Sequence, residues 1–207
     1  MSAGGIGQGG DAQDQARAPT VHALCEQDVD AAVAFDGSFI AFQRLLLQLR
    51  DGALWCDLDS FETEQLDEPY RKNYGDDADA EGLRDYLHRA RGNTATDAAA
   101  FVVRLDGRVA GRMMLSRTWN GFACIDDIAI DRNARRRGAG TALMQAALDW
   151  ARAHGYPGIM LETQDTNVIA CRMYLRHGFA LGGCDRYHYA NEPDIAHETA
   201  LFWYRML

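Results

Sequence analysis

The feature that most constrains the fold of this chain is the stretch from Phe122 to Ala153, FACIDDIAIDRNARRRGAGTALMQAALDWARA. Its apolar start predicts a buried strand, its basic middle a short loop, and its periodic end a long helix. Gly138 and Gly140 lack a Cβ, so the loop backbone can approach a ligand closely. The first turn of the helix has unpaired N–H groups and a partial positive charge. We therefore predict an anion site, suited to the pyrophosphate of a nucleotide-type cofactor.

Regular strand and helix patterns surround this stretch, and together they predict one α/β (α+β) domain. Asp106-Gly107 and Asn120-Gly121 are two-residue hairpin signals, so the strands before the loop form an antiparallel meander. A strand, a helix and a strand then follow in an order that favours a parallel pair. We therefore expect a mixed, mostly antiparallel sheet flanked by helices. The predicted strands are 20–25, 98–105, 108–117, 122–130, 158–163, 179–188 and 198–207, and the predicted helices are 28–35, 80–91, 138–154 and 167–177.

The N-terminal part of the chain is less regular. Residues 1–19 are rich in Gly, Ala, Gln and Asp and lack apolar periodicity, so we predict a flexible extension before a domain that spans 20–207. Phe39 to Leu49 and Ala53 to Phe61 flank the turn signal Asp51-Gly52, which predicts a hairpin.

Composition and charge exclude several kinds of protein. The chain has 207 residues and a net charge of −9, which argues against a general nucleic-acid binder and is compatible with a cationic partner. The five cysteines are widely spaced without a C-x-x-C pair, which predicts neither a disulfide framework nor a zinc site. No other cluster has metal-ligand spacing, so we expect no metal. No apolar run is long enough to span a membrane and no secretory signal is visible, so we expect a cytoplasmic protein.

The order of motifs in the C-terminal half resembles the GNAT superfamily of acetyl-CoA-dependent N-acetyltransferases. The motifs are R-x-x-G-x-G from Arg135 to Gly140 between a strand and a helix, then Asn167 and Tyr174 on the next helix, and then Gly178-Phe179. The resemblance implies the GNAT fold and acetyl-CoA as cofactor. It also implies transfer of an acetyl group to a primary amine.

Two segments are further similar to one group within this superfamily, the streptothricin (nourseothricin) acetyltransferases. They are Leu161 to Leu181, LETQDTNVIACRMYLRHGFAL, and Glu198 to Tyr204, ETALFWY. This similarity implies a small cationic acceptor, a streptothricin-type antibiotic acetylated on its β-lysine amine, and resistance as the outcome. Another small amine, a protein amine, or a non-catalytic acyl-CoA-binding module stay open as alternatives. The resemblance also leaves a homodimer open, because many members of the superfamily are dimers.

The resemblance assigns cofactor contacts to individual residues. The resemblance implies that the loop backbone binds the pyrophosphate of the cofactor, in agreement with the argument from the start of the helix. The resemblance also implies that the backbone of the strand before the loop pairs with the pantetheine arm. The apolar side chains of that strand are expected to lie in the core. The resemblance places Asn167 at a position that contacts the same arm, and this residue could also be the N-cap of its helix. The implied cofactor-binding residues are Ile128, Ala129, Ile130, Arg135, Arg136, Arg137, Gly138, Ala139, Gly140, Thr141, Asn167 and Tyr174.

Proton transfer requires an acid and a base. The resemblance places Tyr174 where the family keeps a tyrosine that protonates the departing thiolate, and a phenol with a pKa of about 10 holds that proton at neutral pH. The alternative is a tyrosine that only packs on the sheet. The candidates for the base are Asp126, Asp127 and Glu162, since acids in apolar strands are costly to bury without a purpose. Adjacent strand residues point to opposite faces, so Asp126 and Asp127 are not expected to face the same site.

Aromatic and acidic residues are the candidates for acceptor binding. Asp67 to Asp79 is polar, contains Pro and Gly, and is predicted to be a loop. Tyr70 and Tyr74 lie in it, and aromatic residues in such a loop either line a site or pack the loop down. The substrate-binding candidates are Tyr70, Tyr74, Asp126, Asp127 and Glu162.

Overall fold

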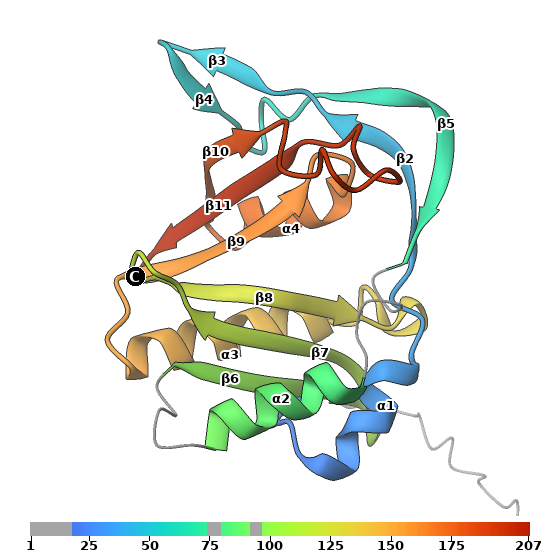
Figure 1. The fold of residues 1–207 in the computed structure, drawn as a ribbon, viewed down its shortest axis with the longest axis vertical. Coiled ribbons are helices and arrows are strands. Elements are labelled where there is room, and N and C mark those ends of the chain that lie inside the picture. Colours follow the sequence, from blue (N-terminus) through green and yellow to red (C-terminus); the bar gives the residue numbers. More distant parts are fainter. Residues whose placement is uncertain (1–17, 74–79, 92–96) are drawn as a thin grey trace, which may run out of the picture.

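The computed structural model describes residues 18–73, 80–91 and 97–207, and its largest element is a seven-stranded sheet (Figure 1). All neighbouring strands are antiparallel except β8 and β9, which are parallel. The predicted fold class is therefore confirmed. In spatial order the strands are β1 (Thr20–Ala23), β6 (Ala98–Leu105), β7 (Arg108–Arg117), β8 (Ala123–Ile130), β9 (Gly158–Gln164), β11 (Ala200–Met206) and β10 (Ala180–Asp185).

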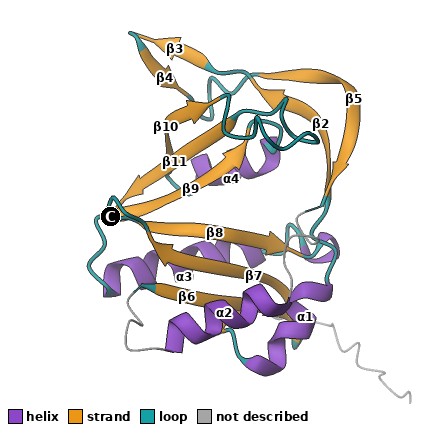
Figure 2. Cartoon of the chain, in the orientation of Figure 1, coloured by secondary structure: helices purple, strands orange, loops and turns teal. Residues whose placement is uncertain are grey.

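Two pairs of helices cover the two faces of the sheet (Figure 2). α1 (Val29–Ala34) and α2 (Ala80–Arg91) pack on one face. α3 (Ala139–Ala153) and α4 (Val168–Arg176) pack on the other, where the larger core cluster lies. This layering follows from the periodic apolar stripe that each helix carries. Two 3-10 turns, Glu26–Asp28 and Arg132–Ala134, precede α1 and α3.

A two-stranded arm of β2 (Phe39–Leu45) and β5 (Thr63–Lys72) runs alongside the sheet (Figure 1). It carries at its tip the short hairpin of β3 (Gln48–Arg50) and β4 (Ala53–Trp55). The predicted turn at 51–52 is present, with positive φ at both residues. The predicted hairpin is confirmed next to this turn, where Gln48 and Leu49 pair with Trp55 and Leu54. It is wrong for the outer part, because Phe39–Leu45 pairs with β5 instead.

The prediction of a loop over Asp67–Asp79 is wrong where β5 occupies its first residues. The arm exposes most of its side chains to solvent, so β5 lacks the apolar alternation that identifies a strand. Its register with β2 jumps from Tyr70 to Gln65, and Pro69 falls within the jump. A proline is tolerated there because no ladder hydrogen bond is required of it.

The turns of the meander differ from one another. Asp106 and Gly107 have φ of 51° and 78°, as a two-residue hairpin turn requires. The predicted two-residue turn at 120–121 is instead a longer loop between Arg117 and Ala123, in which the Gly121 N–H donates to the Thr118 carbonyl at 3.1 Å. The local side-chain bond from Thr118 Oγ1 to the Phe122 carbonyl, at 3.0 Å, stabilises this wider turn.

Candidate active site

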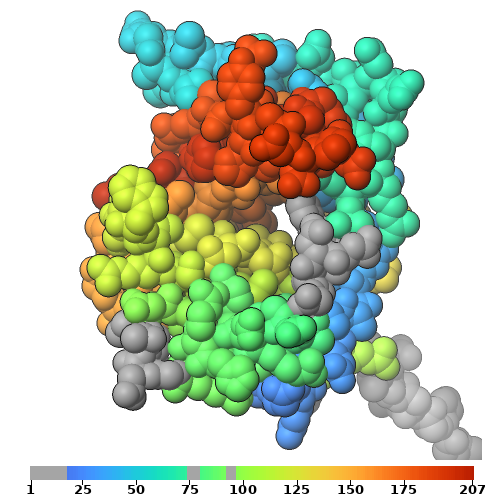
Figure 3. All heavy atoms as spheres, viewed as in Figure 1, coloured from blue at the N-terminus to red at the C-terminus, as the bar shows by residue number. Residues whose placement is uncertain are grey.

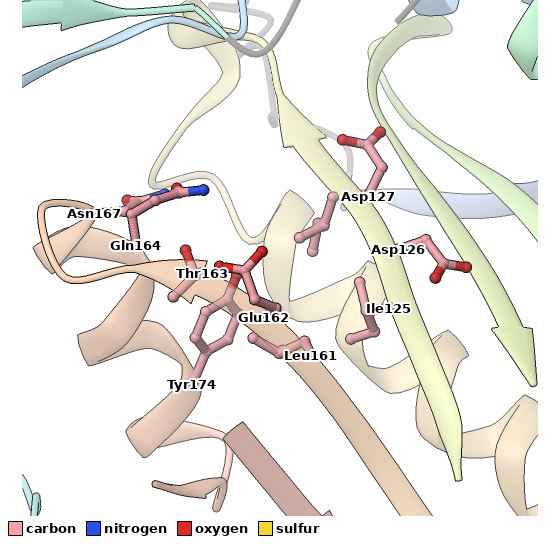
Figure 4. Close-up of a pocket in the computed structure, with 10 residues that line it drawn as sticks. Ile125, Asp126, Asp127, Leu161, Glu162, Thr163, Gln164, Asn167 and Tyr174 are labelled. Atoms are coloured by element: carbon pink, nitrogen blue, oxygen red, sulfur yellow. The ribbon is translucent and has the colours of Figure 1, made fainter. Parts of the chain in front are cut away.

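The site lies where two neighbouring strands separate. Parallel pairing joins only Ala123–Ile125 to Ile159–Leu161, and the rest of β8 diverges from β9 (Figure 1). A cleft of about 190 Å³ lies at this divergence. The surface is correspondingly hollowed between β8 and the orange-red segment that contains β10 and β11 (Figure 3). Six residues predicted from the sequence line this cleft: Asp126, Asp127, Ile128, Glu162, Asn167 and Tyr174 (Figure 4).

Within the described ranges, no strand pairs with the divergent part of β8 on the side of the cleft. Its other edge pairs with β7, through Arg112 opposite Ala129 and Gly111 opposite Ile130. The side chains of Ile128 and Ile130 pack against the core, as their apolar character predicts. The strand thus keeps one edge fixed while the other remains available to an extended ligand.

The glycine-containing loop leads directly into the first turn of α3. Gly138 is the N-cap residue with φ 85°, a conformation that favours glycine. The first helical hydrogen bond runs from the Ala142 N–H to the Gly138 carbonyl at 3.0 Å, so the preceding N–H groups lie outside the helical ladder. A Cβ on Gly140 would lie 3.3 Å from Met173 Sδ, so this glycine also permits the close packing of α3 against α4.

The three loop arginines have different partners. Arg135 turns back and donates from a guanidinium nitrogen to the Gly37 carbonyl at 2.6 Å. Arg137 pairs with Asp106 at 2.7 Å. Arg136 is exposed and has φ 61°. For the predicted anion, the backbone N–H groups and the exposed Arg136 are therefore better placed than the other two side chains, which already bind a carbonyl and a carboxylate.

Tyr174 and Asn167 come from α4. Tyr174 is 4% exposed, and its ring packs 5.9 Å from the ring of Phe179 and 6.1 Å from that of Trp203. The Asn167 side chain accepts a hydrogen bond from the Ala170 N–H at 3.2 Å and so caps the helix. Both residues line the cleft, so packing and capping do not remove them from it.

A β-bulge changes the orientation of the two adjacent aspartates. The register of β7 with β8 moves from Met114 opposite Asp127 to Leu115 opposite Ile125, which leaves Asp126 without an opposite residue. Strict alternation is therefore interrupted, and the expectation that Asp126 and Asp127 face different sites is wrong. Both line the same cleft.

The two aspartates nevertheless have different partners. Asp126 accepts from the Tyr86 hydroxyl of α2 at 2.7 Å. Asp127 accepts from Arg112 Nε at 2.7 Å, and the buried Arg112 also donates to the Ala32 carbonyl at 2.7 Å. Asp127 is thus tied to a buried cation, whereas a neutral phenol holds Asp126.

Glu162 projects from β9 into the cleft (Figure 4). It accepts a hydrogen bond from the Tyr189 hydroxyl, and Gln164 donates to the same hydroxyl at 2.9 Å. Burial raises the pKa of Glu162 above its ordinary value, although the Tyr189 hydrogen bond opposes that shift. A half-buried carboxylate with a raised pKa is a reasonable proton acceptor or cation-binding group.

Tyr70 lies in a different hollow from the other candidates. This second hollow, of about 480 Å³, is formed mainly by β5, and His197 also lines it. The Tyr70 hydroxyl donates to the buried Glu198, which also pairs with Lys72. Tyr74 lies outside the described residues.

Sequence reasoning missed Lys72, Tyr86 and Tyr189. Lys72 is separated from Glu198 by 126 positions and lies in a stretch predicted to be loop. Tyr86 was placed only on a helix face, and Tyr189 lies after β10 in an irregular segment. No local pattern brings these side chains to their carboxylates, so only the tertiary structure could identify them.

Within 18–73, 80–91 and 97–207, no helix combines the length and apolar character needed to cross a membrane. Over the same ranges, no group of three or more His, Cys, Asp or Glu is arranged to hold a metal ion.

Comparison with known sequences places the chain among acetyltransferases. The model of the "Acetyltransferase (GNAT) family" matches residues 58–179. The chain is 36% identical over 167 residues to streptothricin acetyltransferase A of Bacillus subtilis (strain 168), covering 80% of this chain and 87% of that protein. It is 35% identical over 136 residues to a streptothricin acetyltransferase of Escherichia coli, covering 66% of this chain and 70% of that protein.

Solved structures give the same relation. A streptothricin acetyltransferase homologue from Bacillus anthracis str. Ames, in complex with acetyl coenzyme A, superposes with a TM-score of 0.76 at 29% identity, covering 92% of this chain and 98% of that one. Nourseothricin acetyltransferase superposes with a TM-score of 0.70 at 26% identity, covering 92% and 99%.

Proposed function

This chain belongs to the acetyltransferase (GNAT) family, and we propose that it transfers an acetyl group from acetyl-CoA to a primary amine of a streptothricin-type acceptor. The observation that carries the acceptor class is the identity of 36% and 35% to two streptothricin acetyltransferases. Acetylation removes the positive charge of the amine, so resistance to the antibiotic is the expected consequence.

The residues of the chain fit acetyl-CoA. The first turn of α3 follows Gly138 and has backbone N–H groups without helical partners, which suits the binding of a pyrophosphate. The open edge of β8 offers backbone groups to an extended arm. When bound, acetyl-CoA supplies an activated acetyl thioester. The loop 135–141, the backbone of 128–130 and Asn167 are the groups that we assign to its binding.

The proton-transfer groups surround the same cleft. Aromatic packing holds the Tyr174 ring beside the cleft, and a phenol has an acidic proton to donate, which supports a role as the general acid. Of the three candidate bases, Asp127 is paired with Arg112, whereas Glu162 and Asp126 form no ion pair with any described residue. This favours Glu162 and Asp126 for accepting the amine proton or holding the ammonium. The bound amine must lose its proton before it can attack a carbonyl carbon.

Growth protection and thiol release test this function together. A sensitive host that produces the chain should survive nourseothricin, and the purified protein should release thiol from acetyl-CoA when streptothricin is added. The same host with the Tyr174→Phe variant controls for expression. Thiol release with other amines but not with streptothricin would indicate another acceptor, and no release with any amine would indicate an acyl-CoA-binding module.

The oligomeric state and the cellular location of the protein are two further predictions. The homodimer expected from the family resemblance is a prediction that sedimentation equilibrium would test. The cytoplasmic location is a prediction that fractionation of the source cells would test.

A further inference from the structure

Five acidic residues of β8, β9 and the segments beside them fall into two groups according to their partners. In the first group, a cation of the protein already balances each carboxylate. A substrate cation would have to displace that partner, which costs interaction energy in a partly buried site. This group consists of Asp127 with Arg112, Glu198 with Lys72, and Asp165 with Arg44.

The second group is Asp126 and Glu162, and phenols hold both. Asp126 accepts from Tyr86 at 2.7 Å, and Glu162 accepts from Tyr189. Over the described part of the chain, neither carboxylate forms an ion pair. Arg89 lies nearby, but its guanidinium stacks 4.0 Å from the centre of the Tyr86 ring. A phenol is a neutral donor, so it fixes the direction of a carboxylate and leaves its negative charge in place.

These two carboxylates approach the cleft from different elements. Asp126 projects from the bulge of β8, and Glu162 projects from β9 after the strands have diverged (Figure 4). Both line the same cleft. Burial raises the pKa of the Cys124 thiol of β8, and the negative charges of Asp126 and Glu162 raise it further.

We propose that Asp126 and Glu162 each bind one cationic group of an acceptor that carries at least two, and that Tyr86 and Tyr189 position these carboxylates. The inference rests on the proposed function and extends it from a cationic amine to a dicationic acceptor. A monocation can be paired with only one of the two carboxylates and leaves the other uncompensated. A dication compensates both, so the cleft selects it electrostatically.

The surroundings of Glu162 support cation binding there. Lys72, His188 and Glu198 are the charged or titratable groups that act on it besides the Tyr189 hydroxyl. Despite Lys72 and His188, burial dominates and raises the pKa of Glu162. An ammonium group next to this carboxylate would restore the interactions that burial removed.

Kinetics of carboxamide variants test the two contacts. With streptothricin as acceptor, we expect Asp126→Asn and Glu162→Gln each to raise the KM for streptothricin about tenfold or more, because each removes one charge-assisted contact. The KM for acetyl-CoA should stay within about twofold, and the dependence of the streptothricin KM on salt should weaken in both variants. Glu62→Gln, which makes the same change at an exposed position that lines neither hollow, is the matched control and should leave all these values unaltered.

The positioning tyrosines have their own variants. Tyr86→Phe and Tyr189→Phe keep both carboxylates and remove the hydrogen bonds that orient them. We expect each to raise the streptothricin KM by about threefold while the salt dependence stays as in the wild type, since both charges remain. These variants also keep the test decisive if a carboxamide variant does not fold.

Inhibition by simple amines tests selectivity for a dication directly. Against streptothricin acetylation by the wild type, 1,5-diaminopentane should inhibit at a concentration about tenfold or more below that of pentylamine. This advantage should disappear in Asp126→Asn and in Glu162→Gln. Equal inhibition by the two amines, or lower kcat with an unchanged streptothricin KM in both variants, would overturn the inference. If the wild type acetylated no amine at all, the proposed function itself would fail instead.

Discussion

At the scale of single residues, the site combines side chains with structural and chemical roles. Tyr174 illustrates this, because its ring is part of the core while it also lines the cleft. The ring can therefore be kept while the hydroxyl is removed. A phenylalanine at this position preserves the contacts to Phe179 and Trp203 and loses only the acidic proton.

We predict that Tyr174→Phe lowers kcat about 100-fold or more, because general acid catalysis contributes about that factor. The dissociation constant for acetyl-CoA and the midpoint of thermal unfolding should remain close to wild type. Steady-state kinetics, calorimetric titration with acetyl-CoA and circular dichroism provide the three measurements. Wild-type turnover would remove Tyr174 from the acid role.

The buried pair of Lys72 and Glu198 joins the arm to the C-terminal part of the chain. Their side chains are 10% and 0% exposed, and burial lowers the pKa of Lys72 in spite of the nearby carboxylate. Removing one member leaves the other charged and buried, which costs about 3 kcal/mol or more. Replacing both with apolar residues avoids that cost.

We therefore predict that Lys72→Met lowers the free energy of unfolding by about 3 kcal/mol and that adding Glu198→Leu restores much of it. Chemical denaturation would measure both changes. Arg152→Ala breaks the exposed pair with Asp149 and should cost less than about 1 kcal/mol. An equal loss in Lys72→Met and in the double variant would contradict the prediction.

At the scale of elements, the loop that leads into α3 contains two residues in the left-handed conformation, separated by one position. Arg136 has φ 61° and Gly138 has φ 85°. A side chain in this conformation costs about 1 to 2 kcal/mol, whereas glycine adopts it freely. Gly138 therefore adopts this conformation without strain, whereas the backbone of Arg136 is strained. The Arg136 side chain is exposed beside the start of the helix.

Substitutions at these two positions should have opposite effects on stability. Gly138→Ala should lower the free energy of unfolding by about 1 kcal/mol and raise the KM for acetyl-CoA, because the loop must shift. Arg136→Gly relieves the strained conformation, so its folded state should be no less stable than wild type, while the loss of the cation still weakens acetyl-CoA binding. Denaturant melts and acetyl-CoA titrations would check both, and the same sign of stability change in the two variants would contradict this account.

At the scale of the whole molecule, the catalytic domain is expected to be complete without the N-terminal extension. Thr20 begins the edge strand β1, and Pro19 packs near Gly138, so the chain contributes to the fold from this point onward. We predict that deleting residues 1–17 leaves kcat, both KM values and the unfolding midpoint within about twofold or a few degrees of the full chain. A clear rise in the KM for acetyl-CoA would show that the extension takes part in the cofactor site.

Two halves of the sheet meet at the short parallel seam between β8 and β9. The arm of β2 and β5 adds a second connection, since Lys72 of β5 pairs with Glu198 just before β11. The cleft is a product of this arrangement, because the strands diverge immediately after the seam. It also explains why residues from β8, β9 and α4 share one cavity.

The sequence by itself determined the regular core and the family. Local patterns predicted most elements of the core, because a buried helix or strand needs an apolar period and its ends are marked by turn glycines and helix caps. These elements are β6, β7, α2 and the elements from β8 to α4. The order of motifs around Arg135–Gly140 and Tyr174 then identified the GNAT resemblance, and six of the candidate residues line one cleft.

Only the tertiary structure decided the remaining features. The solvent-exposed arm has no apolar period, so β5 could not be recognised, and the β8 bulge adds one residue that shifts Asp126 and Asp127 onto one cleft. The partners of the carboxylates are set by contacts between residues 15 to 128 positions apart, from Arg112 with Asp127 to Tyr70 with Glu198. Such contacts depend on the packing of whole elements, so no local pattern records which carboxylates remain available to a substrate.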